Sequence, residues 1–140
     1  MVVDELAASL LYQVMALAGE VEGRMHSGLE RLELTGPTAN LLWILDPDAE
    51  PQPLRKLAAL MRCDPSNISL LSAQLEERRL AERRPHPRDG RVRTLVLTAE
   101  GRDVRERLLA IVARQSPFAR LDDEEQSRLR SLLAKALADL

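Results

Sequence analysis

The chain contains few of the residues that mark secreted, disulfide-bonded or membrane-embedded proteins. Its single cysteine, Cys63, cannot form an internal disulfide bond. No apolar run approaches the roughly 20 residues that a membrane-spanning helix requires. The first residues also lack the basic flank and long apolar run of a secretion signal. We therefore expect a cytoplasmic protein without a membrane partner.

Aromatic residues are also rare, at 2% of the chain, and comprise only Tyr12, Trp43 and Phe118. A core must therefore consist mainly of Leu, Ala and Val, a composition that favours helices over a β-sandwich. With 140 residues, of which 45% are hydrophobic, the chain is long enough for one domain with a real core.

The sequence offers little for catalysis. Its two histidines, His26 and His86, are far apart and have no Cys or carboxylate at metal-ligand spacing. The chain also has no glycine-rich phosphate-binding loop. We therefore expect no enzymatic activity, no metal site and no cofactor.

Positive charge is concentrated in one segment of the chain. From Gln52 to Leu97 there are ten basic and five acidic residues, a net charge of +5, whereas the whole chain carries −2. The remaining residues therefore carry −7. A basic segment in an otherwise acidic chain is typical of a protein that binds a polyanion.

This basic segment has the pattern of a helix-turn-helix. One helix is predicted over residues 54–61 and a second from residue 65 to about 78, with Asp64 as its N-cap. The buried face of the second helix would contain Ile68, Leu71 and Leu75. In a helix-turn-helix the second helix, the recognition helix, enters the major groove of DNA.

The other faces of this recognition helix carry mostly small and polar side chains. Such side chains let a helix approach base edges closely, and Asn or Gln can pair with adenine through two hydrogen bonds. The alternative is that the Ser and Asn side chains only cap the first turn. The predicted base-contacting residues are Ser66, Asn67, Ser69, Leu70 and Gln74.

A β-hairpin is predicted next, with strands over residues 81–84 and 91–97. Asp89 and Gly90 form a two-residue turn signal, because both turn positions would need positive φ. Arginines beside such a tip can enter a narrow minor groove. The alternative is a solvated basic hairpin with a weak Asp89–Arg91 ion pair. The predicted tip contacts are Arg88, Asp89, Arg91 and Arg93, and the predicted DNA-backbone contacts are Arg55, Lys56, Arg62 and Arg84.

Further helices are predicted on both sides of the basic segment. Apolar residues recur every three or four positions from residue 4 to about 31, and Thr35 with Pro37 marks the start of a helix that ends near residue 45. Prolines at 47, 51 and 53 indicate a connection. Thr98 would cap a helix that ends near Pro117. A pattern close to a capping box opens the last helix at Asp122, and its apolar stripe reaches Leu140.

Taken together, these elements resemble the MarR family of winged helix-turn-helix transcription regulators. The resemblance covers nearly all of the chain. Its most specific parts are Asp89-x-Arg91 followed by Leu97-Thr98 and Gly101, and the run Leu75-Glu76-x-x-x-Leu80-x-x-Arg83.

The resemblance implies a mainly α fold with about six helices and a two-stranded antiparallel hairpin, the wing. It implies one domain, residues 1–140, in which residues 1–34 and 102–140 dimerise and residues 35–101 bind DNA. The homodimer would place two recognition helices in successive major grooves, with Arg91 in the minor groove and Asp89 bracing it. We therefore expect a DNA-binding repressor that acts on a pseudo-palindromic operator.

The resemblance also implies regulation, by a small molecule held between the two lobes or by cysteine oxidation. Candidate pocket residues are Tyr12, Met25, His26 and Trp43, although each could simply belong to the core. Cys63 is the redox candidate, and its alternative role is a small packing residue. Two other functions stay open: a winged-helix module that binds an acidic protein, and a dimeric regulator that no longer senses a ligand.

The chain departs from the family at one position. The family commonly has Gly after the recognition helix, where this chain has Arg79. A left-handed conformation there costs a non-glycine residue roughly 1 kcal/mol. We therefore predict either a different helix end or a strained Arg79.

Overall fold

The computed structural model describes residues 4–138 and divides them into two compact units. Unit 1 comprises the described residues up to Arg24 and from Arg114 onward, and unit 2 comprises Met25–Ala113. The assignment of separate lobes to dimerisation and DNA binding stays a prediction. No helix in the described part of the chain is long and apolar enough to cross a membrane.

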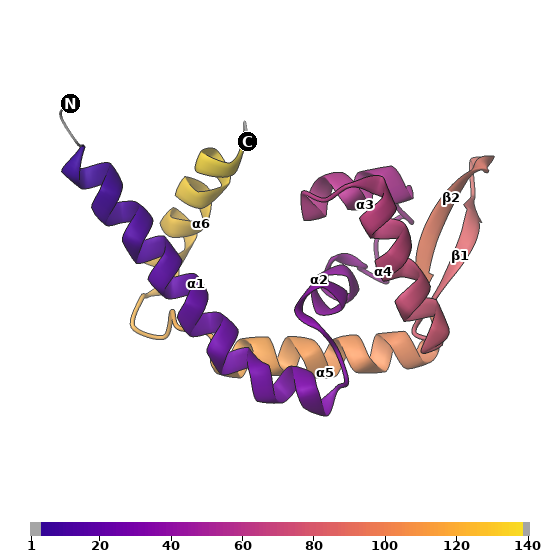
Figure 1. The fold of residues 1–140 in the computed structure, drawn as a ribbon, viewed down its shortest axis with the longest axis horizontal. Coiled ribbons are helices and arrows are strands. Elements are labelled where there is room, and N and C mark those ends of the chain that lie inside the picture. The colour runs from indigo at the N-terminus through magenta and orange to yellow at the C-terminus, as the bar shows by residue number, and fades with distance from the viewer. Residues whose placement is uncertain (1–3, 139–140) are drawn as a thin grey trace. The chain divides into compact units, whose positions relative to one another are not determined.

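The described chain contains six helices and one antiparallel hairpin, as predicted (Figure 1). The helical and strand bounds agree closely with the predicted ones, except that both strands are longer. The predicted end of the last apolar stripe at Leu140 lies outside the described residues. In order, the elements are α1 (Glu5–Arg31), α2 (Gly36–Ile44), α3 (Leu54–Met61), α4 (Pro65–Glu77), β1 (Ala81–His86), β2 (Asp89–Leu97), α5 (Ala99–Gln115) and α6 (Asp123–Leu137).

Two helices begin at the capping residues that the sequence predicts. The Thr35 hydroxyl accepts the Thr38 amide at 3.3 Å, and the Thr38 hydroxyl accepts the Thr35 amide at 2.9 Å. At the start of α6, Asp122 Oδ1 accepts the Glu125 amide at 2.8 Å, and Glu125 Oε1 accepts the Asp122 amide at 3.1 Å. Both pairs satisfy amides that a helix start leaves unpaired.

The cap predicted for α4 is only partly correct. Asp64 is the N-cap residue, but its side chain makes no capping hydrogen bond. The amide of Asn67, which a side-chain cap would satisfy, already donates to the Asp64 backbone carbonyl at 2.9 Å. The helix therefore begins at Pro65 because of backbone geometry, without help from the Asp64 carboxylate.

Helix α4 ends in a left-handed residue, as the second possibility for Arg79 predicts. Arg79 has φ 58°. Its amide donates to the Glu76 carbonyl at 2.9 Å, and the Leu80 amide donates to the Leu75 carbonyl at 2.9 Å. These two bonds form a Schellman motif, which normally favours glycine at this position. Arg79 therefore carries backbone strain.

The core of unit 2 consists of leucines from the helices and the hairpin. Leu41, Leu57, Ile68, Leu95 and Leu108 are at most 2% exposed. The predicted buried face of α4 is confirmed, because Ile68, Leu71 and Leu75 are all buried. Helix α4 is therefore fixed on one side by apolar packing, which leaves its opposite side to solvent.

The hairpin turn lies two residues earlier than predicted. Residues 87 and 88 form the turn, and Asp89 and Gly90 belong to β2. No glycine in the described chain has positive φ, so the predicted Asp89-Gly90 turn is wrong. Pro87 offers a physical reason, because its ring holds φ near −65°, the value that the first central residue of common turns requires.

The base of the hairpin joins α4 to α5. The Thr98 hydroxyl accepts the Gly101 amide at 3.0 Å, which confirms the predicted cap, and donates to the Arg79 carbonyl at 2.7 Å. The Thr98 amide donates to the Leu80 carbonyl at 3.0 Å. A Cβ atom at Gly101 would overlap the Leu80 carbonyl oxygen. The Leu97-Thr98-x-x-Gly101 pattern thus has a structural cause.

Candidate nucleic-acid interface

The outer face of α4 carries the predicted base-contacting side chains. All five are exposed and lie on the side of α4 away from its buried leucines. The side chain of the N-cap residue Asp64 makes no capping hydrogen bond, and the base-contacting role of Ser66 and Asn67 stays a prediction. These exposed residues are Ser66, Asn67, Ser69, Leu70 and Gln74.

Arg83 of β1 holds α4 against the hairpin, a role that sequence reasoning did not assign. Its Nε lies 2.8 Å from Glu76 Oε1, and its Nη2 donates to the Ser69 carbonyl at 2.8 Å. The guanidinium thus contacts α4 at two points, two turns apart. Glu76 and Arg83 both belong to the run that resembles the family. However, they are seven residues apart with a turn between them, so the sequence alone does not predict that their side chains meet.

Arg78 ties the other end of α4 to the end of α1. Its guanidinium donates to the Leu32 carbonyl at 3.0 Å and to the Glu33 carbonyl at 2.7 Å. Carbonyls at a helix C-terminus lack helical partners and carry partial negative charge, so a guanidinium is well placed there. Arg78 and Arg83 therefore both position the recognition helix, although neither was predicted as a site residue.

The wing presents two arginines whose charges are available to a ligand. Arg91 and Arg93 are exposed, and neither makes an ion pair with any described residue. Asp89 Oδ1 accepts the backbone amide of Arg91 at 3.1 Å, so the Asp89–Arg91 side-chain ion pair considered as an alternative does not form. Asp89 orders the backbone beside Arg91 and leaves its guanidinium available.

Arg88, the remaining predicted wing residue, has a different environment. Its Nε lies 3.4 Å from Glu50 Oε1, and the same carboxylate oxygen lies 3.7 Å from His86 Nε2. Glu50 belongs to the proline-rich connection between α2 and α3, so this cluster links the tip of the wing to that connection. To contact a phosphate, the Arg88 guanidinium would have to give up its contact with Glu50 or contact both groups at once.

The predicted DNA-backbone residues differ in how they are constrained. Arg84 Nη2 lies 2.7 Å from Glu82 Oε2, which offsets part of its charge. Arg62 has φ 55° at the end of α3. Arg55 and Lys56 lie in the first turn of α3, and neither forms an ion pair within the described chain. The roles of these four residues stay predictions.

The predicted effector residues are divided between the two units. Tyr12 lies in unit 1, whereas Met25, His26 and Trp43 lie in unit 2. Met25 packs partly buried against the core, and His26 Nε2 lies 3.1 Å from Glu30 Oε1 on the exposed surface. The Trp43 carbonyl accepts two hydrogen bonds from Arg105, at 2.9 and 3.1 Å. Their part in ligand binding stays a prediction.

Cys63 has the environment of a packing residue. It lies partly buried against the hydrophobic core at the turn between α3 and α4. Its amide donates to the Ala58 carbonyl at 3.0 Å and so completes the end of α3. Among the described residues, no group of three or more His, Cys, Asp or Glu is placed to hold a metal ion.

An exposed polar face on α4, held beside a hairpin with exposed arginines, defines a DNA-binding protein of the winged helix-turn-helix class. Comparison with known proteins identifies the family. Residues 34–92 match the model of the MarR family. The chain is also 30% identical over 138 residues to the HTH-type transcriptional repressor MdtR of Bacillus subtilis (strain 168), covering 94% of this chain and 86% of that protein.

Solved structures agree with this assignment. A MarR-family transcriptional regulator from Rhodococcus sp. RHA1 is 27% identical, with a TM-score of 0.80 and coverage of 96% of both chains. CouR from Rhodococcus jostii RHA1, bound to p-coumaroyl-CoA, is 28% identical, with a TM-score of 0.82 and coverage of 96% of this chain and 95% of that chain. The chain belongs to the MarR family of transcription regulators.

Proposed function

We propose that this protein is a cytoplasmic repressor that binds a pseudo-palindromic operator as a homodimer and releases it on binding a small molecule. The observation that carries the proposal is the exposed polar face of α4 beside Arg91 and Arg93, whose guanidinium groups form no ion pair with any described residue. The relative MdtR is named a transcriptional repressor, which supports repression over activation. The ligand of CouR supports a small-molecule effector.

Exposed apolar side chains on α1 and α6 support the homodimer. Leu6 is 78% exposed, and Leu132 is 64% exposed. Helix α6 has no buried residue within its described range. An apolar surface of this extent on a monomer indicates an interface with another chain. With a second copy covering it, light scattering should give twice the chain mass of 15.7 kDa.

Two-fold symmetry sets the expected form of the operator. With both recognition helices on one face of the duplex, the half-site centres should lie about 10 bp apart, one helical turn. Asn67 and Gln74 lie two turns apart on α4, so they would contact different base pairs of the same half-site. Selection of bound sites from random duplexes should recover such a pseudo-palindrome.

The decisive experiment measures binding to the selected duplex by fluorescence anisotropy at several salt concentrations. Log K should fall linearly with log salt, by about 0.9 for each phosphate that the protein neutralises. Arg91→Ala should weaken binding by roughly tenfold and lower this slope by about one. The control is Arg120→Ala, because Arg120 is exposed, lies outside the basic segment and should leave both values unchanged.

Binding that is independent of salt would contradict the proposal, as would equal competition by a scrambled duplex. Equal losses for Arg91→Ala and Arg120→Ala would show that only overall charge matters and would remove the wing from the interface.

A further inference from the structure

Leu70 is the one large apolar side chain of α4 that the core does not bury. It is 56% exposed, whereas Ile68, Leu71 and Leu75 are at most 5% exposed. A single exposed leucine is common on protein surfaces and indicates nothing by itself. However, Leu70 lies in the middle of the face proposed to contact bases, so its surroundings on a bound duplex can be inferred.

Leu70 lies in line with two amide side chains on the exposed face of α4. Asn67 precedes it by three residues and Gln74 follows it by four, spacings that place side chains above one another on a helix. They correspond to rises of about 4.5 and 6 Å along the helix axis. Successive bases of a strand are about 3.4 Å apart. With α4 along the groove, Leu70 would therefore face a base pair between those that Asn67 and Gln74 contact.

The backbone on both sides of Leu70 is held in place. The carbonyl of the preceding residue, Ser69, accepts a hydrogen bond from Arg83 Nη2 of the hairpin at 2.8 Å. The following residue, Leu71, belongs to the hydrophobic core. The Leu70 side chain therefore starts from a fixed backbone, and contact with a base would require little further ordering of the chain.

The major groove offers one favourable partner to such an apolar side chain. Leucine neither donates nor accepts a hydrogen bond, whereas the edges of guanine, adenine and cytosine present donors and acceptors there. A leucine that covered those groups would remove them from water without replacing their hydrogen bonds. Thymine alone carries a methyl group, at C5, and covering this group with an apolar side chain is favourable.

We propose that Leu70 determines specificity for thymine by packing against its C5 methyl group at one position of each operator half-site. The inference rests on the proposed repressor function and adds the identity of one base. The amides of Asn67 and Gln74 suit adenine, which they can bind through two hydrogen bonds. Half-sites selected from random duplexes should therefore have a constant thymine with A·T pairs on either side.

The test removes the methyl group from the selected duplex without changing its base pairing. Each thymine of the half-site is replaced by deoxyuridine, one symmetric pair at a time, and binding is followed by fluorescence anisotropy. At one position the replacement should weaken wild-type binding about fourfold per half-site, or about fifteenfold for the pair, as expected for the loss of one buried methyl group in each. In place of this thymine, 5-methylcytosine should bind about fourfold per half-site more tightly than cytosine.

Variants of the chain distinguish a direct contact from an effect on DNA shape. Leu70→Ala should bind the thymine and uracil duplexes within about twofold of each other, because alanine is too short to cover the methyl group. Leu70→Met, with an apolar side chain of similar length, should keep a uracil effect of at least about twofold per half-site. Low salt keeps the weaker variants within a measurable range.

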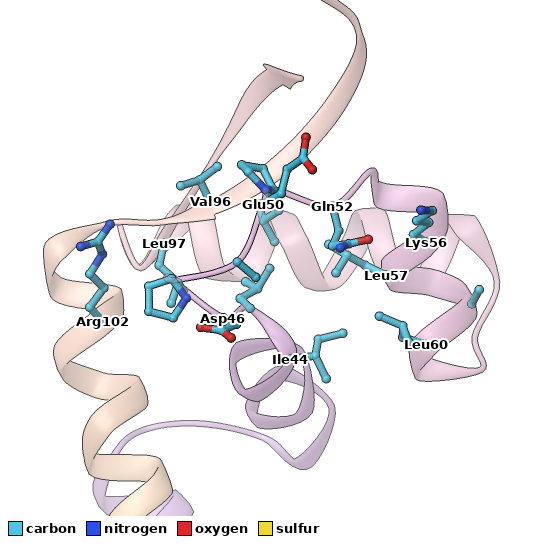
Figure 2. A pocket seen from close by; sticks show the side chains of 16 residues that line it. Ile44, Asp46, Glu50, Gln52, Lys56, Leu57, Leu60, Val96, Leu97 and Arg102 are labelled. Atoms are coloured by element: carbon cyan, nitrogen blue, oxygen red, sulfur yellow. The ribbon is translucent and has the colours of Figure 1, made fainter. Parts of the chain in front are cut away.

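The matched control is Leu60→Ala, which should show the full uracil effect. Leu60 is 62% exposed, close to the exposure of Leu70, but lies on α3. There it lines a cavity whose walls include Glu50 and Arg102 and no residue of α4 (Figure 2). Circular dichroism melting should show that all three variants are folded.

Four results would overturn the proposal: no thymine whose replacement weakens wild-type binding, a full uracil effect in Leu70→Ala, loss of the effect in Leu60→Ala, or equal binding of cytosine and 5-methylcytosine. The second result would assign the effect to DNA shape or to another side chain. Sequence-specific binding without a uracil effect contradicts only the Leu70 contact. A chain that prefers no duplex sequence contradicts the repressor function and this contact together.

Discussion

Replacing Gly101 with alanine should destabilise the protein far more than the same replacement at Gly36. Gly101 lies in the first turn of α5, directly against the residue that leads into β1. An added Cβ would overlap the Leu80 carbonyl oxygen and lie 2.8 Å from its carbonyl carbon. Unstrained contacts between carbon and a carbonyl oxygen are about 3.3 Å or longer. Because both partners are backbone, no rotamer change can relieve the overlap.

The size of the stability loss depends on how far the Leu80 and Gly101 backbones must separate. Overpacking of this kind costs about 1–3 kcal/mol. Separating the two segments would also weaken two hydrogen bonds of Thr98, to the Leu80 carbonyl at 3.0 Å and to the Arg79 carbonyl at 2.7 Å. Each such bond contributes about 1 kcal/mol. Alanine recovers up to about 1 kcal/mol over glycine within a helix. We therefore expect a loss of about 3 kcal/mol in the free energy of unfolding.

Urea unfolding followed by circular dichroism measures this loss, at one fixed protein concentration because dimer formation contributes to stability. The matched control is Gly36→Ala, because no atom lies within 4 Å of a Cβ built there. That variant should stay within about 0.5 kcal/mol of the wild type. A Gly101→Ala variant that loses less than about 1 kcal/mol would refute the reasoning, because the overlap would then be relieved at less than the lowest cost of overpacking.

Two further predictions concern the C-terminal end of α4 and the Glu76–Arg83 ion pair that holds α4 against the hairpin. Arg79→Gly should raise the free energy of unfolding by about 1 kcal/mol, because glycine tolerates φ 58°, and should weaken operator binding through the lost charge. Unchanged affinity in a DNA titration would contradict the second effect. Glu76→Gln should lower operator affinity severalfold, because it breaks the 2.8 Å pair that helps Arg83 hold α4, while costing at most about 1 kcal/mol of stability. Glu77→Gln is its control, because Glu77 is exposed and forms no ion pair within the described residues, and equal affinities for the two variants would exclude the bracing role.

Helix positions were predictable because their signals are local. The hydroxyl of Thr35 and the carboxylates of Asp122 and Glu125 bond to amides three residues away, so the sequence contains both partners within one turn. The apolar spacing that places Ile68 and Leu75 on one face of α4 is equally local. Such features depend on the chain only over three or four residues, and tertiary packing did not alter them.

The hairpin tip shows where a local signal failed. The Asp89-Gly90 pair favours a turn with positive φ, but Pro87 and Arg88 occupy the turn, and Asp89 lies opposite His86. The pairing register shifts between Pro85 and His86, so the strands do not pair evenly up to the tip. Two overlapping turn signals were present in the same four residues, and sequence reasoning chose the wrong one.

The sequence by itself determined the helices, the hairpin, the basic segment and the residues that face outward from α4. Apolar periodicity, helix capping and local charge depend only on residues that are close together in the chain. Only the tertiary structure decided that Arg78 and Arg83 position the recognition helix, that Gly101 lies against Leu80, and that Arg102 shares a cavity with Glu50. These residues meet across long separations in the chain, where no spacing rule applies, because their contacts depend on how the helices and the hairpin pack around a common core.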